Sequence, residues 1–147
     1  MQHPKADRFF EVLDHTADVG IRVWGKTKEE LFENAGRAMF CLLLRNPERV
    51  QPRFRRCITV RANALDELMV NWLSELNFNF CTENEVYREF RVRDLTDQFL
   101  RAEACGETFN PDVHEAQLEI KAVTFHDIHV GPRQDGDGWE ARVIFDI

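Results

Sequence analysis

Two aspartates and a histidine lie within five positions near the start of the chain: Asp14, His15 and Asp18. An alternating, strand-like run follows them directly. At the other end of the chain, the last predicted strand runs into Asp146 and Ile147. If that strand pairs beside the segment that contains Asp18, two side-chain carboxylates and the α-carboxylate of Ile147 converge. A terminus that frays in solvent is the alternative.

Convergence of three anionic groups would have a chemical consequence. The carboxylates would repel one another, and a cation bound between them would remove that repulsion. Ligands that are all oxygen favour a hard ion such as Ca²⁺, Mg²⁺ or Mn²⁺ over zinc. Under this pairing, the two ends of the chain predict a site for a divalent metal ion.

Other patterns that would carry chemistry are missing from the sequence. It contains no G-x-x-x-x-G-K-[ST], G-x-G-x-x-G or G-x-S-x-G motif, so neither a nucleotide-binding loop nor a nucleophile elbow is supported. No H-E-x-x-H pair occurs, and in a strand His126 and His129 would point to opposite faces. The four cysteines form no C-x-x-C pair and are interpreted as reduced thiols: Cys41, Cys57, Cys81 and Cys105.

The charge balance bears on the kind of partner. The chain has 147 residues, with 26 acidic and 19 basic residues and a formal net charge of -7. This charge repels a phosphate backbone unless basic groups are segregated on one face, so direct, stable binding of nucleic acid is not expected. The densest basic cluster, Arg53, Arg55 and Arg56, is interpreted as a solvated loop or strand edge rather than an RNA site.

The length fits a single domain with a core of its own. No apolar stretch is long enough to span a membrane, and the first residues lack the apolar core of a signal peptide. We therefore expect a cytoplasmic protein with no membrane contact. Residues 1–8 are expected to form a flexible N-terminal tail, followed by one domain over residues 9–147.

Two helices are predicted from apolar residues at helical spacing. Thr27 and Glu30 form a capping-box signature for the first helix, which ends before Pro47. Asn63 is predicted to cap the second helix. The apolar stripe of this second helix is interpreted as core that packs against a sheet, rather than as a cofactor site. It consists of Leu65, Leu68, Met69, Trp72, Leu73 and Leu76.

The remaining segments have the composition of strands. Asp137 and Gly138 form a hairpin-turn signal before the last of them. Because strands and helices do not alternate regularly, the pattern predicts an α+β domain with mostly antiparallel sheets and two long helices packed on one face. The predicted strands cover residues 9–13, 19–25, 57–62, 89–93, 99–105, 118–123, 125–130 and 139–147.

Four stretches follow one another along the chain: "DHTADVGIRVWG", "ELMVNWLSELNF", "GETFNPDVHEAQLEIKAVTFHDI" and the terminal "WEARVIFDI". Together they resemble the archease family, in order from about residue 10 to residue 147 and thus over nearly the whole chain. The combination is specific, although no single stretch is. Phe125 departs from the family pattern, in which a tyrosine is common, and this removes one hydroxyl group.

The resemblance implies an accessory protein rather than an enzyme. Archeases assist the RtcB-type RNA ligase, which uses GTP and Mn²⁺ to join RNA ends in tRNA splicing and RNA repair. They promote guanylylation of the ligase histidine and support multiple turnover. The metal site of the family maps onto Asp18, Asp146 and the carboxylate of Ile147. His15 is then expected to orient its loop through hydrogen bonds.

Further positions match motifs of the family. Lys121 is expected either to meet an acidic or phosphate group of the ligase or its guanylate, or to lie in solvent as an ordinary strand lysine. Glu107, His114 and His126 fall at recurrent positions of the family without an assigned role, and building the scaffold is one reading of them. Two other functions stay open: a metal-dependent phosphoester hydrolase with His15 or His126 as its base, and a metal-independent, chaperone-like binding module.

Overall fold

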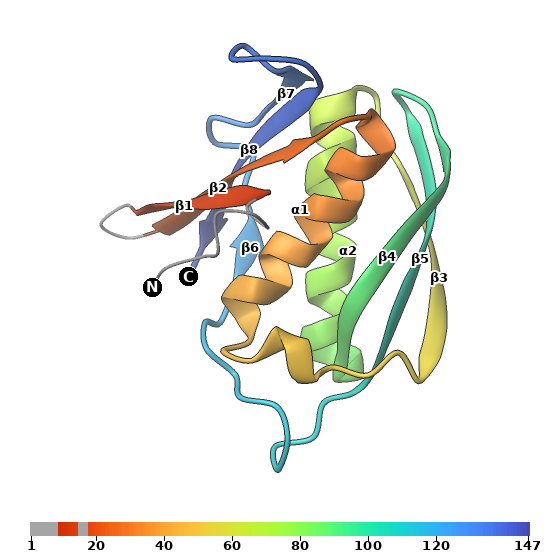
Figure 1. The fold of residues 1–147 in the computed structure, drawn as a ribbon, viewed down its shortest axis with the longest axis vertical. Helices are drawn as coiled ribbons and strands as arrows, with labels where there is room; N and C mark the ends of the chain where they lie inside the picture. The colour runs from red at the N-terminus through yellow and green to blue at the C-terminus, as the bar shows by residue number, and fades with distance from the viewer. Residues whose placement is uncertain (1–8, 15–17) are drawn as a thin grey trace.

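Two helices lie between two β-sheets in the computed structural model (Figure 1). The structure describes residues 9–14 and 18–147, so His15 and the predicted tail of residues 1–8 lie outside the described residues. In chain order the elements are β1 (Phe10–Asp14), β2 (Asp18–Gly25), α1 (Lys28–Leu43), the 3₁₀ helix η2 (Pro47–Arg49), β3 (Phe54–Arg61), α2 (Leu65–Glu83), β4 (Glu85–Leu95), β5 (Phe99–Thr108), β6 (Ala122–Val123), β7 (His129–Pro132) and β8 (Trp139–Asp146).

The first helix, α1, begins where the capping signature predicts. Thr27 is the N-cap residue, and its Oγ1 accepts a hydrogen bond from the backbone N–H of Glu30 at 3.1 Å. The Glu30 carboxylate in turn accepts the backbone N–H of Lys26 at 2.9 Å, one residue before the cap. These two bonds fix the chain at the point where the helix starts. The helix ends at Leu43, before Pro47, as predicted.

The second helix, α2, starts differently from the prediction. Asn63 does not cap it, because the N-cap residue is Ala64, which has no side-chain acceptor. Asn63 instead donates its backbone N–H to the carboxylate of Glu67 at 2.7 Å. A glutamate that reaches back from the first turn therefore organises this helix start. No helix among the described residues is long and apolar enough to cross a membrane.

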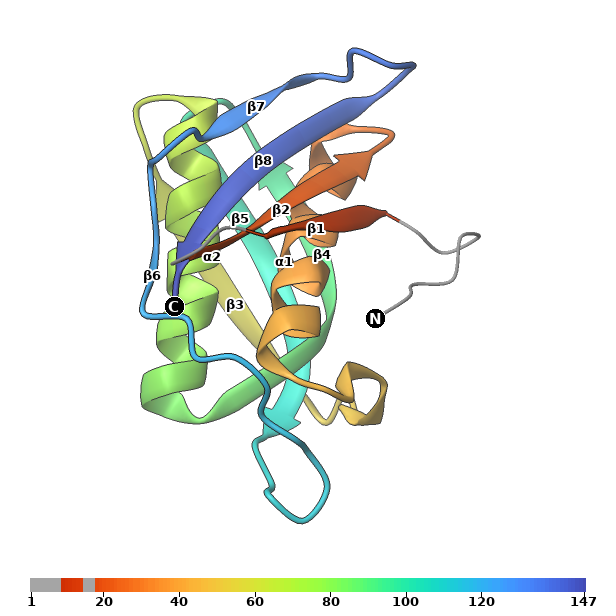
Figure 2. The same cartoon turned by 90° about the vertical axis from the view of Figure 1, so that its left-hand side faces the viewer.

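The larger sheet has five strands and is antiparallel. Its order is β1-β2-β8-β6, and β7 pairs with another part of β8. Strands from the two ends of the sequence are thus neighbours: β2 pairs with β8 from Asp18 opposite Asp146 to Gly25 opposite Trp139. Figure 2 shows β8 running down this sheet toward β6. The strand pairing on which the predicted metal site depends is therefore present.

The smaller sheet has the order β3-β5-β4 and is also antiparallel. Its central strand, β5, turns small residues such as Ala104 and Gly106 toward the helices. A Cβ at Gly106 would lie 1.8 Å from the carbonyl oxygen of Val86, so only glycine permits this approach of β4. The register between the two strands shifts at the same place, between Tyr87 and Glu89.

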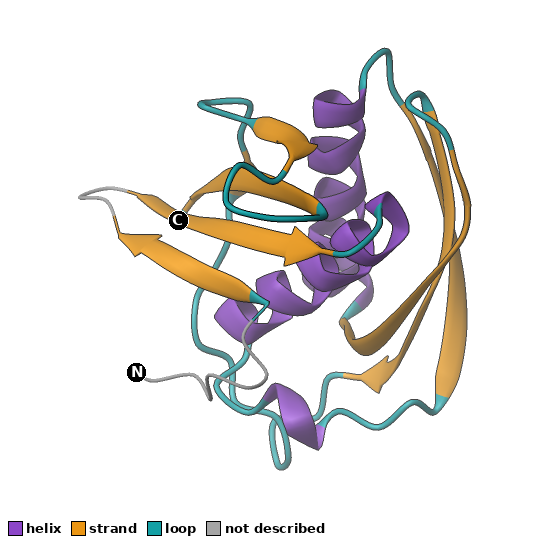
Figure 3. Ribbon diagram, turned by 45° about the horizontal axis from the view of Figure 1, so that its top comes forward, coloured by secondary structure: helices purple, strands orange, loops and turns teal. Residues whose placement is uncertain are grey.

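Each sheet turns one face toward the helices and the other face away from them (Figure 3). The sequence predicts the helices on one face of a sheet, and the structure adds that a second sheet covers their other side. Alternation along β2 places Val19, Ile21 and Val23 in the core. The predicted stripe of α2 fills the space between the sheets, with five fully buried side chains: Leu68, Met69, Trp72, Leu73 and Leu76.

The predicted strand over residues 118–123 is largely wrong, because only Ala122–Val123 form a strand. The segment before it is bound to a helix instead. The side-chain amide of Asn77 on α2 donates to the carbonyl oxygen of Ile120 at 2.9 Å. A carbonyl that is satisfied by a helix side chain needs no neighbouring strand, so the sheet ends there.

The predicted strand over residues 125–130 forms only at its last two residues, which belong to β7. The residues before β7 make a turn, in which the backbone N–H of Ile128 donates to the carbonyl oxygen of Phe125 at 3.3 Å. Asp127 lies in the left-handed region of backbone conformation, with φ 53°. Aspartate tolerates this region better than most residues, and the extended run is interrupted there. β7 then begins at His129.

Candidate functional site

Asp18 and Asp146 occupy directly opposite positions on the neighbouring strands β2 and β8. Their chain neighbours Val19 and Phe145 are buried against the helices, so alternation places both aspartates on the outer face of the five-stranded sheet. Side chains at opposite positions of such a pair have Cβ atoms about 4.5–5.5 Å apart. Two carboxylates are therefore neighbours at one end of this sheet, Asp18 half-buried and Asp146 exposed.

The backbone of Lys121 is held beside the backbone of Asp146, next to the following strand. Ala122 of β6 lies opposite Asp146 on the side away from β2. The backbone N–H of Lys121 donates to the backbone oxygen of Asp146 at 2.7 Å, and the Lys121 side chain is exposed. Ile147 follows directly and is 38% exposed. The structure thus brings four of the predicted residues together, and we call them the carboxylate edge: Asp18, Lys121, Asp146 and Ile147.

The donor atoms of the carboxylate edge suit a hard divalent cation. Like charges at directly opposite positions destabilise an antiparallel pair, and a cation bound between them offsets this repulsion. Within residues 9–14 and 18–147, no three His, Cys, Asp or Glu side chains are grouped so that they could hold a metal ion. Asp18 and Asp146 would therefore need a further oxygen donor to hold a metal ion, and Ile147 is the residue that follows Asp146 directly.

His114 and Glu107 form a largely buried pair at the start of the loop that leads to Lys121. The Nε2 atom of His114 lies 3.0 Å from a carboxylate oxygen of Glu107. The Nδ1 atom of the same ring accepts the backbone N–H of Asn110 at 2.9 Å. Because Nδ1 is an acceptor, a neutral ring carries its proton on Nε2 and donates it to Glu107.

The Glu107 carboxylate collects two more donors. It accepts the backbone N–H of Gln51 at 2.8 Å and the Nε–H of Arg53 at 3.0 Å. Burial raises the pKa of this carboxyl group, but the hydrogen bonds from Gln51, Arg53 and His114 outweigh burial and hold the pKa below its usual range. Glu107 belongs to β5 of the smaller sheet, so this pair anchors the loop over residues 109–121 and is not part of the carboxylate edge.

His126 lies exposed on the turn after β6. Its Nε2 atom is 3.4 Å from a carboxylate oxygen of Asp127, and its backbone N–H donates to the hydroxyl of Thr124 at 3.3 Å. Thr124 in turn donates both its backbone N–H and its hydroxyl to the carbonyl oxygen of Ile144. The turn is thus fastened to β8, two residues before Asp146.

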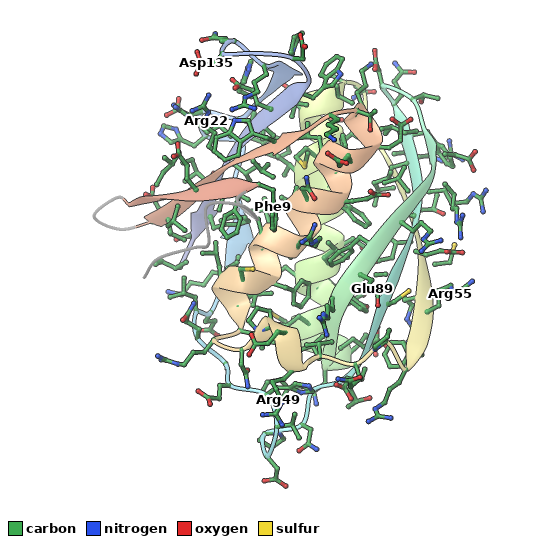
Figure 4. The ribbon with its side chains drawn as sticks, in the orientation of Figure 1. Phe9, Arg22, Arg49, Arg55, Glu89 and Asp135 are labelled. Atoms are coloured by element: carbon green, nitrogen blue, oxygen red, sulfur yellow. The ribbon has the colours of Figure 1, made fainter. Side chains whose placement is uncertain are left out.

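Arg22 is a residue of this sheet that the sequence patterns did not single out. Its guanidinium group lies 3.0 Å from Glu140, 3.4 Å from Asp135 and 3.7 Å from Glu11. The hydrogen bond with Glu140 raises the pKa of Arg22 above its already high value. Figure 4 shows Arg22 and Asp135 in the same part of the molecule. These partners come from both ends of the chain, so no local motif indicates the cluster that joins β1, β2 and β8.

Relatives of this chain match it over nearly its whole length. Residues 10–147 match the model of the Archease protein family (MTH1598/TM1083). Protein archease of Methanosarcina barkeri is 37% identical over 142 residues, which cover 94% of this chain and 95% of that protein. Protein archease of Thermococcus kodakarensis is 36% identical over 143 residues, which cover 95% of this chain and 99% of that protein.

Two solved structures have a similar fold. The solution structure of protein 1598 of Methanobacterium thermoautotrophicum has a TM-score of 0.80 at 34% identity and covers 95% of this chain and 99% of that one. The crystal structure of an archease, possible chaperone, from Thermotoga maritima has a TM-score of 0.61 at 17% identity and covers 100% and 98%. The molecule is thus an α+β protein in which two sheets enclose two helices. The chain belongs to the archease family.

Proposed function

We propose that this protein activates an RtcB-type RNA ligase, by promoting its GTP-dependent guanylylation and multiple turnover in tRNA splicing or RNA repair. In this proposal it is an accessory protein of the ligase and not itself an enzyme. Membership of the archease family supports the proposal. The observation that carries it is the placement of Asp18 directly opposite Asp146, which gives the molecule a pair of neighbouring carboxyl residues, one half-buried and one exposed.

The proposed activating site is the carboxylate edge with a divalent cation, Ca²⁺, Mg²⁺ or Mn²⁺. Asp18 and Asp146 supply side-chain oxygens, and Ile147 supplies its α-carboxylate. A bound cation would supply positive charge and coordination positions for oxygen atoms of the partner. The two aspartates belong to paired strands rather than to a loop, so the sheet fixes the backbone from which their carboxylates extend.

The other predicted residues fit supporting roles in this proposal. The backbone bond to Asp146 fixes the position of Lys121, and its exposed ammonium group is proposed to meet a carboxylate or phosphate of the ligase or its guanylate. His126 lies on a turn fastened to β8, and His15 lies outside the described residues. The net charge of -7 favours encounter with a basic, RNA-binding enzyme.

Assays of the purified protein, alone and with its ligase, separate this proposal from two others. A metal-dependent phosphoester hydrolase would turn over RNA or nucleotide without a partner. A metal-independent, chaperone-like module would stimulate the ligase equally well after loss of the aspartates. We expect no turnover by the protein alone, and stimulation of ligation at a low molar ratio that Asp18→Asn reduces sharply. Hydrolysis by the clean protein, or full stimulation by Asp18→Asn, would contradict the proposal.

A further inference from the structure

The outer face of the smaller sheet gathers arginines, although the chain as a whole is acidic. Both described long helices lie on the inner side of this sheet, so its outer face is turned to solvent (Figure 1). Alternation and strand register bring five arginines to that face, and we call it the arginine face: Arg55 and Arg61 of β3, Arg91 and Arg93 of β4, and Arg101 of β5.

One carboxylate lies among three of these arginines. The register places Glu103 of the central strand opposite Arg91. The Glu103 carboxylate accepts two hydrogen bonds from Arg93, at 2.9 and 3.2 Å, and lies 3.8 Å from the guanidinium group of Arg55. A single carboxylate neutralises one positive charge. The three guanidinium groups around Glu103 therefore keep an excess of positive charge and are held at defined positions.

The rest of the arginine face adds positive charge and an aromatic ring. The guanidinium group of Arg61 lies over the ring of Phe99 at 4.8 Å, and Arg101 is paired with Asp94 at 2.7 Å. The side chains remain accessible, with 66% of Arg55 exposed. Figure 4 places Arg55 and Glu89 along this sheet. Its five arginines outnumber the acidic residues of the same face: Glu89, Asp94 and Glu103.

We propose that the arginine face binds the phosphate backbone of single-stranded nucleic acid. A guanidinium group can bind a phosphate through two parallel hydrogen bonds to its oxygens. Aromatic rings at the surface, such as the half-buried ring of Phe99, are where unpaired bases stack. Five arginines gather on this one face, and local segregation of basic groups is the condition under which an acidic chain binds a polyanion. The remainder of the chain carries net negative charge that repels phosphate, so the binding is expected to be weak.

This inference does not rest on the proposed function. The arginine face and the carboxylate edge belong to different sheets, on opposite sides of the two helices (Figure 3). An acidic protein segment is the other anionic partner to consider. The phosphate backbone is favoured because its negative charges repeat at a regular spacing along the strand. The arginines likewise lie at the fixed spacing of neighbouring β-strands.

Fluorescence anisotropy of a labelled oligouridylate with the full chain tests the proposal. We expect binding at low salt that weakens as salt rises, with a slope of log K against log salt near about -2, because each of three phosphate contacts contributes about -0.7. The double variant Arg55→Gln and Arg91→Gln is expected to bind roughly tenfold more weakly with a shallower slope. The matched control, Arg45→Gln and Arg142→Gln, removes the same charge outside the arginine face and should change binding less than about twofold.

Three results would overturn the proposal. Absence of binding at low salt would leave the arginines as charges that keep the edge strands β3 and β4 from pairing with other chains. Equal weakening in both double variants would show an effect of net charge alone. Tighter binding of polyglutamate than of oligouridylate at the same salt would assign the face to an acidic protein segment. Circular dichroism confirms that each variant is folded before it is compared.

Discussion

Asp146 carries a negative charge directly opposite Asp18, and this repulsion is expected to cost the metal-free protein stability. We predict that Asp146→Asn raises the free energy of unfolding in the presence of a chelator by roughly 0.2–1 kcal/mol, the range for cross-strand pairs. Asp137→Asn, in the exposed turn before β8, is the control and should have no effect. Urea denaturation measures both variants. Lower stability of Asp146→Asn would show that the two carboxylates do not repel each other across the strands.

Glu107 makes the stability of the folded protein depend on pH. Burial raises its pKa, but its three hydrogen-bond donors outweigh burial, so the pKa is lower in the folded chain than in the unfolded chain. The stability that this group contributes is therefore present above the unfolded pKa of about 4.3 and is lost as the pH falls through the folded value. We predict that Glu107→Gln is less stable than the native protein at pH 7 and that the difference shrinks in acid.

Denaturation series between neutral and acidic pH measure the effect of Glu107→Gln. Glu89→Gln is the matched control, because Glu89 is an exposed carboxyl group of the neighbouring strand. It should follow the native curve at every pH. A Glu107→Gln curve that runs parallel to the native one down to acid would mean that the hydrogen bonds to Gln51, Arg53 and His114 do not depend on the charge of this carboxylate.

Single residues differed in how well the sequence predicted their surroundings. Asp18 and Asp146 lie at the ends of alternating runs, so the hypothesis of a single strand pairing was enough to predict that they are neighbours. The pairing of Glu107 with His114 depends on the conformation of an irregular loop, which periodicity does not describe. Arg22 meets partners from both ends of the chain, and only the completed sheet shows them.

At the scale of elements, the N-cap of α1 offers a direct test of how the helix is started. The hydroxyl of Thr27 accepts the backbone N–H of Glu30, a bond that alanine cannot make. We predict that Thr27→Ala lowers the free energy of unfolding by about 1 kcal/mol, whereas Thr27→Ser, which keeps the acceptor, changes it by much less. Equal losses in the two variants, measured by urea denaturation, would show that the hydroxyl does not stabilise the helix start.

Sequence patterns predict the two helices better than they predict the helix start of α2 and the short strand β6. Helical periodicity over many residues predicted both helices, and the cap of α1 was correct because its side chains act within one turn. The cap of α2 was wrong because Glu67 binds the backbone of Asn63 from inside the helix. The run over residues 118–123 has strand composition, but the side chain of Asn77 binds it to α2, and composition does not contain that contact.

At the scale of the whole molecule, the sheet order joins the two ends of the sequence. β2 and β8 are neighbours although more than a hundred residues separate Asp18 from Asp146. The sequence pattern predicts mostly antiparallel strands. It does not predict that the strands divide into two sheets around the helices, because long-range packing decides that division. A ligand that bridges β2 and β8 would therefore stabilise the fold as a unit.

This connectivity predicts a response of global stability to calcium. A cation that binds the folded chain alone stabilises it by about 2.7 kcal/mol at a hundred times its dissociation constant. We expect saturating Ca²⁺ to raise the melting temperature of the native protein and of Asp137→Asn, but not that of Asp18→Asn. Differential scanning calorimetry with calcium and with a chelator measures these shifts. The same shift in all three proteins would place the calcium effect outside the carboxylate edge.

We propose that the carboxylate edge is the part of the molecule that activates the ligase. The most direct measurement is the rate at which an RtcB-type ligase is guanylylated by GTP and Mn²⁺, with the native protein, Asp146→Asn or Asp137→Asn added at the same low molar ratio. We predict acceleration by the native protein and by Asp137→Asn, and little or none by Asp146→Asn, although all three are folded. Equal acceleration by the three proteins would contradict the claim.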